Sequence, residues 1–245
     1  METTEPTGIL FGIACVLLFA VSFLAGDIAG IIIERQSARK WRHAAEQMGF
    51  VFDGRKRRSH SLSEFFLPKL IFPGAEETAF SFGQVMKSIS GRVQGLELAI
   101  NDLTVWDYHT RGPVIYRAVV CTIGGDGINL PGPIGLVKIR GVLFYGFNLD
   151  KSLKEYTFPN EGKFSASYAV FARKGSPPWT FTPELRSFCT EHRHEIDCLS
   201  INEKDIVLVW TDKSPERFPQ LVDLAFGIAS RLLESVPPVT VHKDS

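Results

Sequence analysis

Cys189, His192, His194 and Cys198 are the residues whose types and spacing come closest to a metal site. Zinc is held by four thiolate or imidazole ligands in a tetrahedron. Cys189 and His192 can share one face of a helix, but His194 points elsewhere if that helix continues, and the spacing matches no standard zinc motif. We therefore predict no metal site. We interpret the two cysteines as small buried residues and the histidines as solvent-exposed.

Asp107, Tyr108 and His109 suggest acid–base chemistry because a carboxylate, a phenol and an imidazole are adjacent. Neighbours on a strand point to opposite faces, so only Asp107 and His109 can converge. His109 is followed by Thr-Arg-Gly-Pro, a sequence typical of a hairpin turn. The sequence therefore predicts no catalytic residue here.

Gly124, Gly125 and Gly127 form a glycine-rich stretch without the Lys and Ser/Thr of a phosphate-binding loop. A loop is the simpler interpretation. The sequence contains no Gly-x-Ser-x-Gly elbow, His-Glu-x-x-His motif or kinase signature, so no cofactor-binding residue is predicted.

The clearest feature is an uncharged run near the N-terminus. Gly8–Gly26 reads GILFGIACVLLFAVSFLAG, which is about as long as a bilayer's hydrocarbon core is thick. Apolar residues resume after Asp27, so we predict a transmembrane helix over residues 8–33, preceded by a tail over residues 1–7. Asp27 is expected near the interface. A signal peptide would have a basic start, and a core helix would show polar positions at helical spacing.

The charges that flank this run predict its orientation. Glu2 and Glu5 precede it, whereas the following residues are basic, namely Arg35, Arg39, Lys40 and Arg42. The positive-inside rule then places the C-terminal part in the cytoplasm, on a single-pass protein of the inner membrane.

Residues 34–60 form a basic juxtamembrane segment. Trp41, Ala44, Ala45 and Met48 fall on one face of a predicted helix, with Ser37 as N-cap and Gly49 just after the end. The helix either lies on anionic lipid or packs on the following domain, and its small apolar face favours packing.

A second basic run occupies residues 55–58. It lacks aromatic interleaving, so we expect no nucleic-acid binding, and contact with anionic lipid is the simpler interpretation.

Residues 61–237 are predicted to form one soluble α+β domain, followed by a disordered tail over 238–245. The chain has equal numbers of acidic and basic residues and four cysteines without a pairing pattern, which fits a reducing compartment. Apolar alternation predicts a mostly antiparallel meander. Its strands are expected at Ala79–Ser90, Arg92–Ile100, Thr104–His109, Val114–Ile123, Leu136–Ile139, Val142–Phe147 and Phe164–Ala172.

The C-terminal part is predicted as α-β-β-α. Thr182-Pro183-Glu184 is typical of a capped helix start, and the helix is expected to run to His192. Strands follow at Ile196–Ile201 and Ile206–Trp210. A final amphipathic helix, Pro215–Glu234, is expected to cover one face of the sheet.

Several segments in this order resemble a known family. After the apolar run and basic linker come a helix ending in Gly49-Phe50 and SISGRVQGLELAINDLTVWDYHTRGP with its Asp107-Tyr108 pair. KFSASYAVFA and the helix start FTPELRSF come later. Together they resemble bacterial single-pass membrane-anchored proteins that carry a domain of unknown function. The resemblance implies the placement and architecture described above and no catalytic residue.

Two functions follow from these observations. The first is a membrane-anchored, non-catalytic domain that binds a protein partner or scaffolds at the cytoplasmic membrane surface, with the bilayer contacted through residues 8–33. The alternative is a membrane-tethered, hydrolase-like enzyme whose site is assembled from scattered residues.

Overall fold

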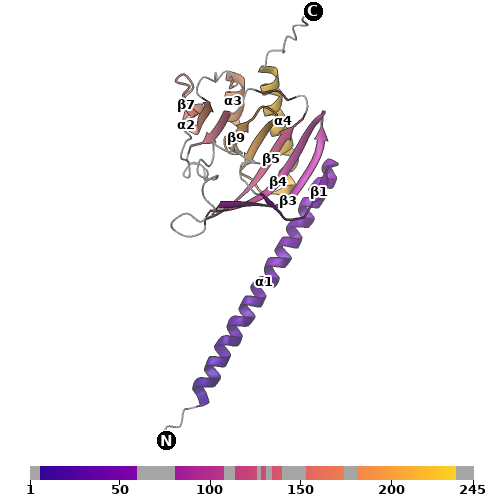
Figure 1. The fold of residues 1–245 in the computed structure, drawn as a ribbon, viewed down its shortest axis with the longest axis vertical. Helices are drawn as coiled ribbons and strands as arrows, with labels where there is room; N and C mark the ends of the chain where they lie inside the picture. Colours follow the sequence, from indigo (N-terminus) through magenta and orange to yellow (C-terminus); the bar gives the residue numbers. More distant parts are fainter. Residues whose placement is uncertain are drawn as a thin grey trace, which may run out of the picture.

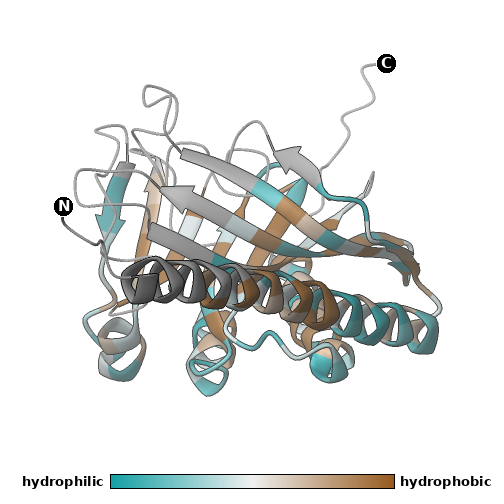
Figure 2. Ribbon diagram, turned by 90° about the horizontal axis from the view of Figure 1, so that it is seen from below, coloured by the Kyte–Doolittle hydropathy of each residue, from teal (hydrophilic) through white to brown (hydrophobic). Residues whose placement is uncertain are grey.

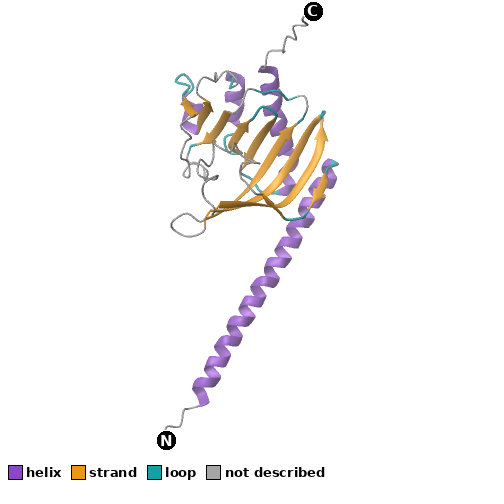
Figure 3. Ribbon diagram, viewed as in Figure 1, coloured by secondary structure: helices purple, strands orange, loops and turns teal. Residues whose placement is uncertain are grey.

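The computed structural model describes residues 6–59, 81–107, 114–125, 128–130, 134–139, 153–173 and 181–235 (Figures 1 and 3). A long N-terminal helix is followed by a run of strands and then by the helices and strands of the C-terminal part. In order they are α1 (Pro6–Met48), β1 (Val51–Asp53), β2 (Arg57–Ser59), β3 (Ser81–Val93), β4 (Leu96–Asp107), β5 (Val114–Gly124), β6 (Ile134–Lys138), β7 (Leu153–Tyr156), α2 (Gly162–Ser167), β8 (Tyr168–Arg173), α3 (Pro183–Glu191), β9 (Ile196–Ile201), β10 (Asp205–Trp210), the 3-10 helix η4 (Pro215–Arg217) and α4 (Phe218–Ser235).

Helix α1 is one continuous element of 43 residues that projects away from the rest of the fold (Figure 1). At about 1.5 Å per residue it is about 64 Å long. The predicted N-cap at Ser37 is wrong, because Ser37 lies inside the continuous helix α1. No glycine or proline interrupts the helix between Gly30 and Met48. Gly49 does end the helix, with a φ of 69° that favours glycine, as predicted.

Within the part of the chain that the structure describes, no helix is both long enough and apolar enough to cross a bilayer. The structure describes the backbone of residues 6–17 as part of α1 and leaves their side chains undescribed. The transmembrane span therefore stays a prediction.

The ten described strands form one antiparallel sheet, and the α+β class is confirmed. Its order is β1-β3-β4-β5-β10-β9-β6-β8-β7, with β2 also paired to β3. The predicted meander holds only for β3, β4 and β5. The hairpin β9–β10 lies between β5 and β6, so the C-terminal α-β-β-α part completes the centre of the sheet.

The β3–β4 hairpin corrects two predicted strand boundaries. Arg92–Ile100 and Thr104–His109 were expected as separate strands, but Leu96–Asp107 is a single strand. The turn lies at Gln94 and Gly95, which both have positive φ, as a two-residue hairpin turn requires. Tyr108 and His109 lie outside the described residues.

The predicted strand Phe164–Ala172 is half wrong. Its first part is the short helix α2, and only Tyr168–Arg173 is a strand. Phe164 is buried in the core while the Ser167 hydroxyl donates to the Lys163 carbonyl, a local bond typical of a helix. The predicted strand Val142–Phe147 lies outside the described residues.

A row of apolar side chains crosses the sheet and forms the centre of the core. Register places these residues opposite one another on seven strands: Ile89, Ile100, Cys121, Leu208, Leu199, Leu136 and Val170. All are fully buried and belong to one core cluster that also includes residues of α1, α3 and α4. Figure 2 shows the helices gathered on one side of the sheet.

Helices α3 and α4 form as predicted. The Thr182 hydroxyl accepts a hydrogen bond from the Leu185 backbone N–H at 3.3 Å and caps α3. In α4, the apolar stripe packs into the core, and Leu221, Ala225 and Ile228 are buried.

We expect Leu221→Ala to lower the free energy of unfolding by about 2–5 kcal/mol, because it leaves a cavity in the core. Denaturant titration of the wild type and variant measures this. The exposed Gln220→Ala on the same helix is the matched control and should change the free energy by less than about 0.5 kcal/mol. An unchanged midpoint for Leu221→Ala would show that α4 is not part of the core.

Candidate functional site

The last turns of α1 are part of the domain core. Trp41, Ala44 and Ala45 are 1–4% exposed. The Trp41 and Phe218 rings meet edge-to-face with centroids 4.6 Å apart, which joins α1 to α4. Immediately after the helix, Phe50 lies against Gly91 so closely that a Cβ there would come within 2.3 Å of its ring. The prediction that this segment packs on the domain is confirmed.

Two exposed ion pairs join α1 to neighbouring elements. Lys40 Nζ lies 2.9 Å from Glu216 Oε1 in η4, and Lys56 Nζ lies 3.0 Å from Glu34 Oε1. The hydrogen bond from Lys40 lowers the pKa of Glu216. Exposed pairs of this kind contribute little stability.

A buried charged cluster lies on the strands beside this helix. Asp102 of β4 accepts from Lys87 of β3 at 3.3 Å and from Arg117 of β5 at 2.9 Å. The side chains of Lys87 and Asp102 are only 4% and 3% exposed. The hydrogen bond to Asp102 raises the pKa of Arg117. Glu34 pairs with Lys56, and the next residue, Arg57, pairs with Val85 of β3, two positions from Lys87.

The opposite side of α1 is basic and exposed. Arg35 and Arg39 lie one helical turn apart and are exposed, and Arg42 stacks over the Phe52 ring at 5.5 Å. Ile31, Ile32 and Ile33 precede them and are 49–65% exposed. We call residues 31–42 of α1, with the three strand residues of the charged cluster, the junction.

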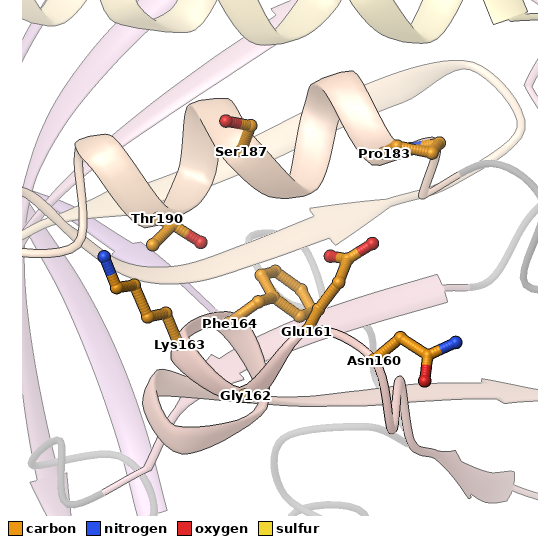
Figure 4. Close-up of a pocket in the computed structure, with 8 residues that line it drawn as sticks. All are labelled: Asn160, Glu161, Gly162, Lys163, Phe164, Pro183, Ser187 and Thr190. Atoms are coloured by element: carbon orange, nitrogen blue, oxygen red, sulfur yellow. The ribbon is translucent and has the colours of Figure 1, made fainter.

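A separate hollow of about 350 Å³ lies between α2 and α3 (Figure 4). Glu161, Lys163, Ser187 and Thr190 line it with Phe164. Arg186 donates to both carboxylate oxygens of Glu161, and this bond lowers the pKa of Glu161. A carboxylate held ionised in this way is a poor general acid or base near neutral pH.

A second hollow of about 480 Å³ lies at the far ends of β3, β4 and β5. Ser90, Ala99 and Thr122 line it together with Arg92 and Glu97, whose side chains pair at 2.6 Å. Both partners are largely exposed. Its polar groups therefore face water rather than a closed cavity.

The sequence's metal candidates are not brought together. Cys189 lies in α3 on the helix-covered face of the sheet. Leu199 belongs to that same core, so its neighbour Cys198 points to the opposite face. Burial raises the pKa of both thiols, that of Cys189 to about 12, and a thiol in this state is a weak ligand and nucleophile.

The two histidines lie beyond the end of α3. His192 Nδ1 lies 2.7 Å from Glu195, whereas His194 is exposed. Among the described residues, no group of three His, Cys, Asp or Glu side chains is arranged to hold a metal ion.

The remaining sequence candidates give no site in the described part of the chain. Asp107 is the last residue of β4 and pairs with Ser81 and Val114. Gly124 ends β5, while Gly127 lies outside the described residues. Asp27 is exposed on α1.

No protein-family model matches the chain, and no curated protein matches it. Among solved structures, the chain is similar to the crystal structure of the mycobacterial trehalose monomycolate transport factor A, TtfA. The TM-score is 0.53 at 11% sequence identity, over 84% of this chain and 98% of that chain. The two share a fold. The resemblance to bacterial membrane-anchored proteins stays a prediction.

The charged cluster was missed by the sequence analysis. The sequence contains a signal for this cluster. Lys87 lies two residues from the core residue Ile89, and Asp102 lies two residues from the core residue Ile100, so each shares a strand face with a core residue. A lysine and an aspartate on neighbouring strands at inward positions indicate a buried pair. The pairing of β3 with β4 had to be known first.

We expect Asp102→Asn to lower the free energy of unfolding by about 3–5 kcal/mol, because it leaves the buried Lys87 ammonium without a counter-charge. Glu97→Gln on the same strand removes one partner of an exposed pair and should cost about 0–1 kcal/mol. Urea titration of the detergent-solubilised chain compares the two. Equal losses would show that the cluster contributes no more than a surface pair.

Proposed function

We propose that this chain is a membrane-anchored, non-catalytic protein whose domain binds or scaffolds at the cytoplasmic surface of the inner membrane. The observation that carries the proposal is the division of α1. Its described residues Leu18, Phe19, Val21 and Leu24 are 61–73% exposed although they are apolar. Contact with lipid would remove this surface from water, at about 25 cal/mol per Å².

The other end of the same helix supports a membrane anchor rather than a helix that is detached from the domain. Trp41 is 2% exposed within the domain core, so the helix cannot leave the domain without opening that core. A single element thus provides an apolar outer part and a domain-bound inner part. This arrangement is typical of a helix that fixes a domain at a membrane.

The described hollows favour binding over catalysis. The carboxylate in the α2–α3 hollow is paired with Arg186, and burial raises the pKa values of the Cys121 and Cys189 thiols to about 12. Neither group is suited to acid–base or nucleophilic work near neutral pH. The shared fold with a protein named as a transport factor is consistent with a non-enzymatic role in a membrane process.

We expect the full-length protein to sediment with membranes and to resist alkaline carbonate extraction. The double substitution Leu18→Arg with Val21→Arg should make it extractable, since an arginine near a helix centre costs about 2.5–3.5 kcal/mol of insertion free energy. Leu18→Ile with Val21→Ile is the control and should stay in the membrane. Recovery of the wild-type chain in the supernatant would contradict the anchor.

We expect the C-terminus to lie in the cytoplasm, because basic residues such as Arg35 and Arg39 follow the apolar run while Glu2 and Glu5 precede it. A C-terminal fluorescent protein that matures only in the cytoplasm should fluoresce. An alkaline phosphatase fused at the same point should be inactive. An active phosphatase would reverse the orientation.

A further inference from the structure

Five basic residues of the juxtamembrane segment fall into two groups, and Arg42, which lies over the Phe52 ring, belongs to neither. Lys40, Arg55 and Lys56 each have a carboxylate partner, at 2.9 Å from Glu216, 3.1 Å from Asp53 and 3.0 Å from Glu34. Among the described residues, no carboxylate lies within ion-pair distance of Arg35 or Arg39. The first group has its charge balanced by carboxylates of the chain, and Arg35 and Arg39 have no such partner in the part of the chain that the structure describes.

Arg35 and Arg39 also repel each other. They are four residues apart on α1, so their side chains lie on the same face of the helix, where like charges are destabilising. Both are exposed, so water and an external counter-charge can reach them. Two adjacent guanidinium groups that have no ion-pair partner among the described residues are suited to bind phosphate oxygens, which they contact through bidentate hydrogen bonds.

Their distance from the apolar run fits a phospholipid headgroup. The predicted span covers residues 8–33. Arg35 follows its end by about 3 Å along the helix and Arg39 by about 9 Å. Headgroups occupy the first several ångströms beyond the hydrocarbon, and charge acts over a further Debye length of about 8–10 Å. Both long side chains can reach this zone.

The packing of α1 holds the two arginines in place. Trp41 lies one and a half turns after Arg35 and is fixed in the core, and Lys40 and Glu34 pair with other elements. The helix is continuous through this region, so rotation of the arginines away from the bilayer would require the domain to rotate as well. Their side chains are therefore presented at a fixed height.

We propose that Arg35 and Arg39 form a binding site for the phosphate groups of anionic phospholipid in the leaflet from which α1 emerges. The proposal rests on the membrane anchor and names its partner more closely. The paired cations Lys40, Arg55 and Lys56 are placed outside the site, because a carboxylate of the chain already balances the charge of each. The site thus selects anionic over zwitterionic lipid through two residues and not through the whole basic segment.

The test uses the full-length chain reconstituted in phosphatidylcholine vesicles that contain trace spin-labelled phosphatidylglycerol or spin-labelled phosphatidylcholine. Electron paramagnetic resonance measures the fraction of each label that the protein immobilises. We expect the wild type to immobilise the phosphatidylglycerol label in preference. The double variant Arg35→Gln with Arg39→Gln should abolish this preference. The double variant Arg35→Lys with Arg39→Lys should keep part of it, because lysine keeps the positive charge.

Lys154→Gln with Lys163→Gln is the matched control, because it removes the same charge from exposed positions on β7 and α2, far from the point where α1 leaves the fold (Figure 1). This variant should keep the wild-type preference. An unchanged preference in the double arginine variant, or an equal loss in the control, would overturn the proposal. A chain that reconstitutes but shows no preference overturns only the lipid site, whereas a chain that does not insert overturns the anchor.

Discussion

The packing of Trp41 against Phe218 is the contact on which the arrangement of the whole chain depends. It joins the first helix to the last one, although the two residues are 177 positions apart in the sequence. Both rings are almost fully buried, so the contact is part of the core and not an addition to its surface. Any force or restraint on the outer part of α1 is therefore transmitted directly to the helical layer that covers the sheet.

The sheet beneath that layer combines an apolar row with one buried charged cluster. The row begins with Ile89 and Ile100, and the next inward positions on the same two strands are Lys87 and Asp102. Burying these two charges is costly unless they are paired, so their pairing opposes slippage of β3 against β4. The charged side chains lie beside the part of β3 that pairs with β2, which begins directly after Lys56, the partner of Glu34.

The sequence predicted those elements whose signals are local. The cap at Thr182, the strands β9 and β10 and the stripe of α4 are all encoded within a few neighbouring residues, and all were confirmed. The errors concern signals that depend on distant contacts. Asn101 and Asp102 interrupt the apolar pattern of β4, and the residues that balance the charge of Asp102 lie on other strands. The insertion of β9–β10 beside β5 has no local signal.

The same distinction applies to the junction. Composition alone indicated a basic segment, but counting charges treats Lys40, Lys56 and Arg35 as equivalent. The folded chain makes them different, because Glu216 and Glu34 form ion pairs with Lys40 and Lys56. A flexible tether would let every basic residue sample the membrane surface in turn. A continuous helix that ends in the core removes that freedom, and the position of each cation on the helix then decides whether it contacts the protein or its surroundings.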